Sequence, residues 1–171
     1  MKKTVILLAV LAMAVSANAG VIMTGIIDGY YSSPKGIELY IDGTVDLSDY
    51  SIEIEANGGD SWYNGITFAS GSVYSDQFLY ITSTVTDETY NDGMVDIFAS
   101  ATLANTIHDG SFNQNGNDAI RILDDSGVVV DQYGDPSDSG IGDYSVAWAY
   151  DDSFAYRLSG TTANGTFTIG D

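Results

Sequence analysis

The sequence predicts an all-β domain built from two antiparallel sheets that pack face to face. Short runs alternate apolar and polar residues with a period of two, which places the apolar side chains on one face of each strand. β-Branched and aromatic residues dominate these runs, as is typical of strands. Asp-Gly and Asn-Gly pairs separate the runs and favour tight reversals of the chain. Many short strands joined by frequent tight turns indicate a β-sandwich.

Residues 1–19, which precede the first strand, have the features of a secretory signal peptide. Two lysines form a positive start, an apolar run follows, and Ala17-Asn18-Ala19 supplies the small residues that signal peptidase requires. The apolar run is too short to span a bilayer as a stable helix, and no cysteine follows it to carry a lipid anchor. We expect cleavage before Gly20 and export to the periplasm, the cell surface or the medium. Residues 20–171 are then expected to form one domain without a transmembrane segment.

Alternation marks most strands in order along the chain, and the clearest runs cover residues 37–42, 51–56, 78–82, 146–150 and 167–169. The segment 96–108 is different, because its apolar residues fall near helical spacing while two threonines disfavour a helix. We expect either a short helix or a covering loop there.

A hairpin is predicted over residues 119–131. Its strands would place Ile120 and Ile122 opposite Val128 and Val130, with a turn over Asp124–Gly127 between them. The polar residues that flank the hairpin are expected to accept hydrogen bonds from backbone N–H groups and so to define its ends; they are Asn117, Asp118 and Asp131. Arg121 and Arg157 are expected to pair with nearby carboxylates.

Two stretches carry a resemblance to a known family: NGNDAIRILDDSGVVVDQYG over 115–134, and WAYDDSFAYR over 148–157 with GTTANGTF following at 160–167. The opening adds a strand over 21–27, the run GIELY at 36–40 and DLSDYSI at 46–52. Together these resemble the lamin-tail domain of secreted bacterial proteins. The resemblance implies an immunoglobulin-like antiparallel β-sandwich without an active site of its own. In bacteria such domains often accompany extracellular nucleases or phosphoesterases.

The charge is strongly acidic, with 24 Asp and Glu against five Lys and Arg and a net charge of −19. Removal of residues 1–19 would leave Lys35, Arg121 and Arg157 as the basic residues. A surface this acidic repels phosphate backbones and anionic membranes, so we expect no direct binding to nucleic acid. Solubility in a salty medium is the simplest reason for the charge, and calcium binding by some carboxylates is the alternative.

Catalysis is not expected. His108 is the one histidine, it lies beside a predicted turn, and the chain has no Gly-x-Ser-x-Gly nucleophile elbow. Phosphoryl chemistry also needs cations that the chain scarcely supplies. Paired carboxylates could cleave glycosides, but the sequence singles out no such pair.

Calcium is the one cofactor that the sequence leaves open. The segment 113–118 is superficially similar to an EF-hand loop, but it has aspartate where the loop needs glycine and lacks the closing glutamate. Two other acidic clusters are candidate ligands, with solvated turn residues as the alternative; they are Asp87, Glu88, Asn91 and Asp92, and Asp135, Asp138 and Asp143.

Aromatic residues are numerous, with 12 Tyr and two Trp. Trp62-Tyr63 and Tyr30-Tyr31 are predicted at exposed loop tips, where they could stack on sugars or on a partner protein; alternatively they close the ends of the sandwich, while Trp148 fills its core. We therefore expect a secreted, non-catalytic interaction or structural domain with a protein or glycan partner. The alternatives are an N-terminal accessory module of a longer extracellular nuclease or phosphoesterase, and a carbohydrate-binding module.

Overall fold

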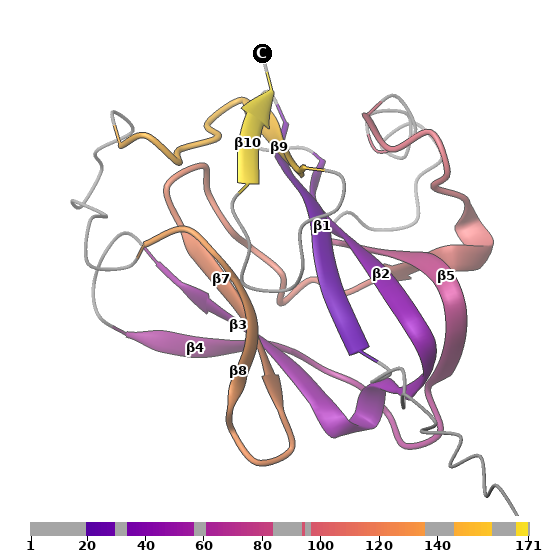
Figure 1. Cartoon of the computed structure of the whole chain (residues 1–171). Coiled ribbons are helices and arrows are strands. Elements are labelled where there is room, and N and C mark those ends of the chain that lie inside the picture. Colours follow the sequence, from indigo (N-terminus) through magenta and orange to yellow (C-terminus); the bar gives the residue numbers. More distant parts are fainter. Residues whose placement is uncertain are drawn as a thin grey trace, which may run out of the picture.

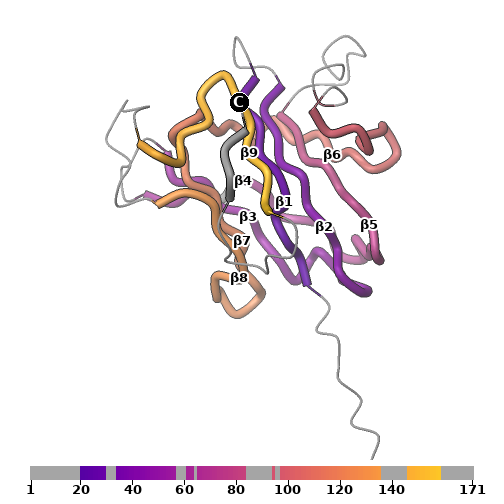
Figure 2. The backbone as a smooth tube through the Cα atoms, turned by 45° about the horizontal axis from the view of Figure 1, so that its top comes forward, coloured from indigo at the N-terminus to yellow at the C-terminus, as the bar shows by residue number. Residues whose placement is uncertain are grey.

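The computed structural model confirms the all-β sandwich (Figure 1). It describes residues 20–29, 34–56, 61–83, 94, 97–135 and 146–158, together with the backbone of 167–170. Two sheets form the layers, and Figure 2 shows the smaller sheet beside the larger one. The predicted signal peptide lies outside the described residues. The two-sheet architecture is what alternation predicted, whereas the immunoglobulin-like topology stays a prediction.

The larger sheet has six strands in the order β10-β9-β1-β2-β5-β6. Its pairs are antiparallel except for β5 and β6, which run parallel. The strands are β1 (Gly20–Asp28), β2 (Lys35–Asp46), β5 (Val73–Thr82), β6 (Thr106–His108), β9 (Ser153–Arg157) and β10 (Phe167–Gly170).

The smaller sheet has four antiparallel strands in the order β4-β3-β7-β8. Its strands are β3 (Tyr50–Glu55), β4 (Trp62–Thr67), β7 (Ala119–Asp124) and β8 (Val129–Tyr133). A short 3-10 turn, η2 (Leu47–Asp49), leads from β2 in the larger sheet into β3 in the smaller one. The chain therefore crosses between the layers at this end of the sandwich.

The core lies between the sheets and follows the predicted alternation. In β2, Ile37, Leu39 and Ile41 are fully buried, and they meet inward-facing residues of the small sheet such as Ile52 and Ile122 in one continuous cluster. Burying a side chain of this size contributes about 1.5–3 kcal/mol, so the alternating strands supply most of the driving force for folding. A core of this extent can stabilise the fold without disulfides, and the chain has no cysteine.

A second apolar cluster covers part of the outer face of the large sheet. Phe98 packs on Tyr80, with 5.6 Å between ring centroids, and on Tyr156 at the same separation. The segment that carries Phe98 begins with a helical turn in which the N–H of Phe98 bonds to the carbonyl of Met94 at 2.7 Å. Further along it forms a 3-10 turn, η3 (Leu103–Asn105), and strand β6. Of the two expectations for residues 96–108, the covering loop is closer to the structure, although the last residues add a strand to the sheet.

The predicted hairpin is present as β7 and β8, but its register differs from the prediction. Ile122 lies opposite Asp131, and Ile120 lies opposite Tyr133. An irregularity between Ile122 and Leu123 shifts the pairing, and Val128 is exposed in the turn. The inward-facing positions of β8 are therefore Asp131 and Tyr133, both buried.

The strand predicted over 146–150 is also wrong, because Ala149 donates to the carbonyl of Val146 in a turn. This turn nevertheless packs on the core as expected. Tyr150 is fully buried, while Trp148 is half-buried and meets Tyr133 edge to face at 6.2 Å between centroids. Trp148 thus caps the core at one end and does not fill it.

Asp131 and Arg157 join the two sheets inside the sandwich. The guanidinium of Arg157 donates to both carboxylate oxygens of Asp131 at 2.7 Å, and the N–H of Met23 in β1 donates to the same carboxylate at 2.9 Å. The prediction that Asp131 accepts a backbone N–H and that Arg157 pairs with a carboxylate is confirmed. The side chain of Asp118 likewise accepts the N–H of Asn115 at 2.7 Å.

Candidate functional site

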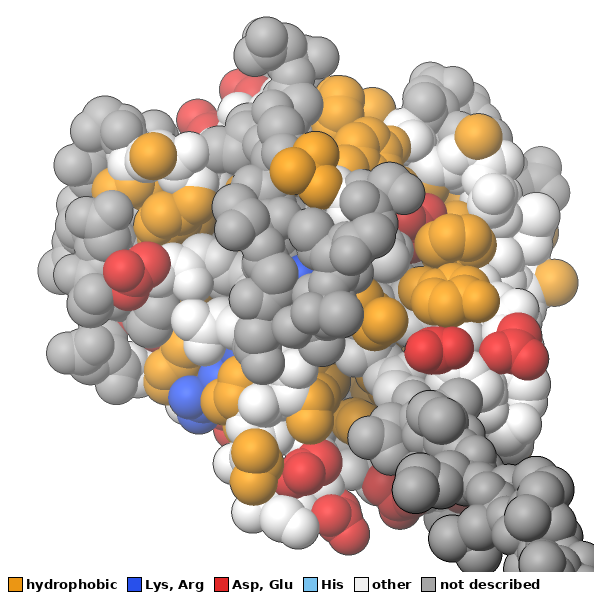
Figure 3. Space-filling model, viewed as in Figure 1, with side chains coloured by type: hydrophobic (Ala, Val, Ile, Leu, Met, Phe, Trp, Pro, Cys, Tyr) orange, Lys and Arg blue, Asp and Glu red, His pale blue; other side chains and the backbone are white. Residues whose placement is uncertain are grey.

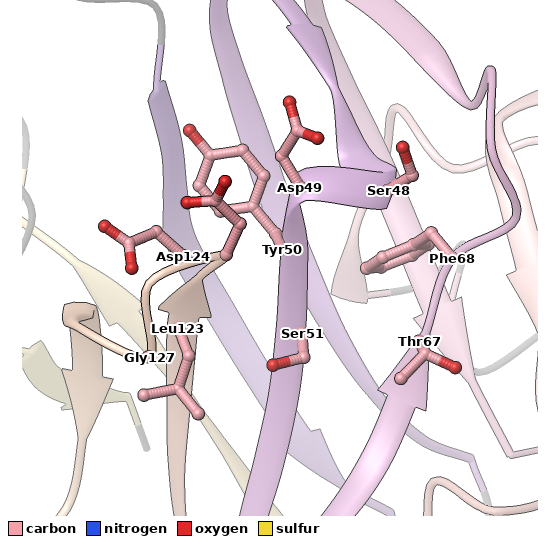
Figure 4. A pocket seen from close by; sticks show the side chains of 10 residues that line it. Ser48, Asp49, Tyr50, Ser51, Thr67, Phe68, Leu123, Asp124 and Gly127 are labelled. Carbon is pink, nitrogen blue, oxygen red and sulfur yellow. The ribbon is translucent and has the colours of Figure 1, made fainter.

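A hollow of about 350 Å³ opens at the end of the sandwich where β3 begins. Three separate segments line it: η2 with the start of β3, the end of β4, and the turn between β7 and β8. We call it the Tyr50 hollow; its lining residues are Ser48, Asp49, Tyr50, Ser51, Thr67, Phe68, Leu123, Asp124, Asp125 and Gly127 (Figure 4). Its volume lies within the range of small-ligand sites, about 300–1,000 Å³.

Local hydrogen bonds set the first wall of the hollow. The carboxylate of Asp46 accepts the N–H of Ser48 at 3.0 Å and so caps η2 at its start. The N–H of Leu47 donates to the carbonyl of Ser72 at 2.9 Å, which ties η2 to the loop before β5. These two bonds hold Asp49 exposed at the rim and start β3 at Tyr50.

The β7–β8 turn forms the opposite wall. One carboxylate oxygen of Asp124 accepts the N–H of Ser126 at 3.0 Å and that of Val128 at 2.8 Å. Gly127 sits at φ +76, a left-handed conformation that favours glycine. Asp124 is therefore partly occupied in building the turn, whereas Asp125 beside it is exposed.

Aromatic rings and carboxylates meet in the hollow. Tyr50 and Phe68 are both half-buried and pack on the core. In Figure 4 Tyr50 and Asp124 lie on one side of β3, and Phe68 lies on the other side. Burial raises the pKa of the Tyr50 hydroxyl, and the neighbouring charges of Asp49, Asp124 and Asp125 raise it further. The hollow is thus a negative, acceptor-rich site with an apolar floor.

The outer face of the small sheet continues from the hollow. Ser51 lies between Thr67 and Leu123 across the strands, and all three line the hollow. In the next row along β3, Glu53 accepts two hydrogen bonds from Arg121, at 2.7 and 2.5 Å. The same guanidinium stacks 4.0 Å from the ring centroid of Trp62.

Trp62 and Tyr63 open strand β4 and do not form a loop tip. Because successive strand residues point to opposite faces, they cannot act as one platform. Trp62 lies on the outer face with Arg121, while the hydroxyl of Tyr63 reaches the carbonyl of Asn113 at 3.3 Å. Trp62 is also half-buried, so Arg121 covers part of the ring that a sugar would need.

Most other candidates from the sequence lie outside the described residues: Tyr30, Tyr31, Asp87, Glu88, Asp92, Asp138 and Asp143. Asp135 is described and exposed at the end of β8. Within the described part of the chain, no three His, Asp or Glu side chains are arranged to hold a metal ion. A calcium site stays a prediction that concerns the remaining residues.

His108 is the last residue of β6 and lies opposite Thr82 of β5, directly before the predicted turn. The turn follows at Asp109, whose carboxylate accepts the N–H of Ser111 at 2.9 Å. The imidazole is half-buried and belongs to the edge of the large sheet, on an element that does not line the Tyr50 hollow.

The comparisons with known proteins identify no relative. No family model matches the chain, and neither a curated protein nor a solved structure is detectably similar to it. The resemblance to lamin-tail domains therefore stays a prediction from the sequence. Among the residues that the structure describes, no helix is long and apolar enough to cross a membrane.

Proposed function

We propose that this chain is an exported, non-catalytic binding domain whose ligand is a neutral, polyhydroxylated molecule such as a glycan. Export rests on the signal-peptide features of residues 1–19. The binding role rests on the Tyr50 hollow, in which aromatic rings and several hydrogen-bond acceptors line one cavity. Sugars present apolar C–H faces and hydroxyl donors, and this lining is complementary to both.

The charge of the hollow supports a neutral ligand over an anionic one. Its lining contains three carboxylates and no basic residue. The whole chain carries a net charge of −19, so a phosphate, a sulfate or an acidic sugar would be repelled on approach. Hydroxyl groups donate hydrogen bonds to carboxylates without this repulsion.

The aromatic pair on the opposite sheet is the rival surface. Tyr40 and Phe78 lie across from each other on β2 and β5 with 5.2 Å between ring centroids, and Phe78 is 38% exposed. Figure 3 shows hydrophobic side chains gathered over this part of the large sheet, with Asp and Glu beside them. We place the ligand at Tyr50 because three segments combine aromatic rings and carboxylates around one hollow there.

Titration of the purified domain with neutral and anionic oligosaccharides, followed by calorimetry, tests the proposal. Neutral glucans, mannans and xylans should include a binder, and polyanionic heparin and alginate should not bind. Asp49→Ala should weaken the binding at least about tenfold, because a hydrogen bond to a charged acceptor contributes about 1.5–3 kcal/mol.

Asp42→Ala is the matched control, since Asp42 is also an exposed aspartate but lies on the large sheet. If Asp42→Ala or Phe78→Ala weakens the binding and Asp49→Ala does not, the site lies on the large sheet. A panel in which no neutral glycan binds would remove the glycan assignment.

A further inference from the structure

The end of the sandwich opposite the Tyr50 hollow contains a buried lysine. Lys35 begins β2, whereas Asp46 at its other end caps the turn that forms the hollow. The side chain of Lys35 is 5% exposed, and that of Asp28, opposite it on β1, is 6% exposed. Two ionisable groups are thus enclosed where the loops cover this end of the core.

The amine of Lys35 lies against the side-chain amide of Asn115. Lys35 Nζ donates to Asn115 Oδ1 at 2.6 Å and also to the backbone carbonyl of Gln114. The amide carbon of Asn115 is one covalent bond beyond that oxygen, so the amine lies next to a carbonyl group that a nitrogen nucleophile can attack. The carboxylate of Asp28 lies 3.5 Å from the same nitrogen.

Hydrogen bonds keep Asn115 in this place. Its N–H donates to Asp118 Oδ2 at 2.7 Å. The side chain of the preceding residue, Gln114, donates to the carbonyl of Ile27 in β1 at 2.9 Å. These bonds anchor the loop at Asn115 and at the residue before it, and so keep the amide near the amine.

The surroundings of Asp28 suit a proton carrier. Burial raises the pKa of its carboxyl, and this effect outweighs the attraction of Lys35 and the hydrogen bond from the N–H of Gly116. A carboxyl that holds its proton more readily in this buried place is able to receive one from the amine 3.5 Å away. The transfer also produces the uncharged amine that nucleophilic attack requires.

We propose that Lys35 and Asn115 become joined by an intramolecular isopeptide bond, with Asp28 carrying the proton. The neutral Nζ attacks Cγ of Asn115 and forms the new C–N bond, while the carbonyl electrons move to Oδ1. The protonated Asp28 stabilises this oxygen by donating a hydrogen bond to it. The amine proton then passes through Asp28 to Nδ2, the Cγ–Nδ2 bond breaks, and ammonia leaves. Atoms balance without oxidant, cofactor or water.

The bond would connect positions 80 residues apart. It links the start of β2 to the loop before β7, and hence the large sheet to the small one. A covalent link over such a loop restricts the unfolded chain in the way a disulfide does. It needs no oxidising compartment, and the chain has no cysteine with which to make the alternative.

Intact-mass and tandem mass spectrometry of the purified full chain test the proposal. The wild type should be lighter than its sequence by about 17 Da, the mass of one ammonia, and a branched peptide should contain both Lys35 and Asn115. Lys35→Met and Asn115→Ala should have their calculated masses. Asn115→Asp should be lighter by about 18 Da, because the same attack on a carboxylic acid releases water. Asp28→Ala, if folded by circular dichroism, should leave most of the chain unlinked.

Asn115 precedes Gly116, so a succinimide formed by the backbone would also release ammonia. A loss of mass that persists in Lys35→Met would assign the succinimide and overturn the proposal. A wild type at its full calculated mass would overturn it as well. An unchanged yield of the branched peptide in Asp28→Ala would remove Asp28 from the mechanism. These outcomes do not depend on any ligand at the Tyr50 hollow.

Discussion

The molecule contains two arginine–carboxylate pairs of similar geometry in opposite surroundings. Arg157 and Asp131 lie between the sheets with side chains 3% and 0% exposed, and their closest contact is 2.7 Å. Arg121 and Glu53 lie on the outer face of the small sheet with side chains 25% and 16% exposed, at 2.5 Å. By contact distance alone, the outer pair would rank as at least as strong as the inner pair. Their surroundings show that they do different things.

The inner pair is part of the architecture. Beyond Asp131, Arg157 donates to the carbonyl of Met23 at 2.7 Å, and Asp131 accepts the N–H of the same residue. Three strands, β1, β8 and β9, therefore depend on one pair of charges. The outer pair has an aromatic neighbour, Trp62, and shields that ring from solvent. Burial, more than distance, decides what each pair contributes.

Replacement of each arginine by methionine should separate the two pairs most strongly. Arg157→Met leaves the Asp131 carboxylate buried without its countercharge, and the free energy of unfolding should fall by about 3–5 kcal/mol. Arg121→Met breaks a pair that water partly solvates, and the loss should be about 0.2–1 kcal/mol. Urea denaturation of the two variants at neutral pH measures both values.

The double variant Arg157→Met/Asp131→Leu is the control, because it removes the stranded charge and should recover part of the loss. Equal losses for the two single methionine variants would show that burial does not distinguish the pairs.

The arginine pairs also show how far sequence reasoning reached. The scarcity of cations predicts that Arg121 and Arg157 pair with carboxylates. It does not predict which carboxylates, because the partners come from other strands, 68 and 26 residues away. The hairpin was predictable from its turn, but the irregularity at Ile122 left no mark in the alternation. A single shifted residue was enough to bring Asp131 inside.

The Tyr50 hollow was beyond prediction for the same reason. Its walls come from η2, the end of β4 and the β7–β8 turn, and each segment alone reads as an ordinary turn or strand end. Lys35 carried no local signal of burial either, since its contacts with Asn115 depend on a loop 80 residues away. Alternation predicts which face of a strand is buried, but not which loops meet at the ends of a sandwich.

Two glycines allow a second comparison of interior and surface. A Cβ at Gly116 would lie 2.2 Å from the backbone nitrogen of Asp151, so Gly116→Ala must displace backbone that helps to cover the Lys35 end. We expect a loss of about 1–3 kcal/mol or more. At Gly127 a Cβ meets nothing within 4 Å, and the cost comes from its φ of +76 alone; Gly127→Ala should lose about 1 kcal/mol.

Thermal denaturation of the two alanine variants measures the difference. The Gly116 variant should also disturb the contact between Lys35 and Asn115, which the Gly127 variant should leave unchanged. Equal stability of the two variants would mean that the backbone at the Lys35 end accommodates a Cβ at no greater cost than the β7–β8 turn does.

The smallest expected effect is a difference in the sign of pH dependence between two aspartates. Burial raises the pKa of Asp28 in the folded protein above its ordinary value of 3.8. At a pH between 3.8 and the folded-state pKa, the folded protein therefore binds more protons than the unfolded chain. The contribution of Asp28 to stability therefore falls as pH rises through that window. An isopeptide bond would remove the positive charge of Lys35, which lowers the pKa of Asp28. The pKa of Asp28 is therefore raised with or without that bond.

Asp46, which is half-buried beside the Tyr50 hollow, should behave in the opposite way. Its hydrogen bond from the N–H of Ser48 lowers its pKa below 3.8, so its contribution is complete above 3.8 and is lost as pH falls through the folded-state pKa. We expect the Tm difference between wild type and Asp46→Asn to shrink on acidification from about pH 6 to about pH 2. The difference between wild type and Asp28→Asn should shift in favour of the wild type over the same range. If acidification changes both Tm differences in the same direction, the opposite pKa shifts of Asp28 and Asp46 are wrong.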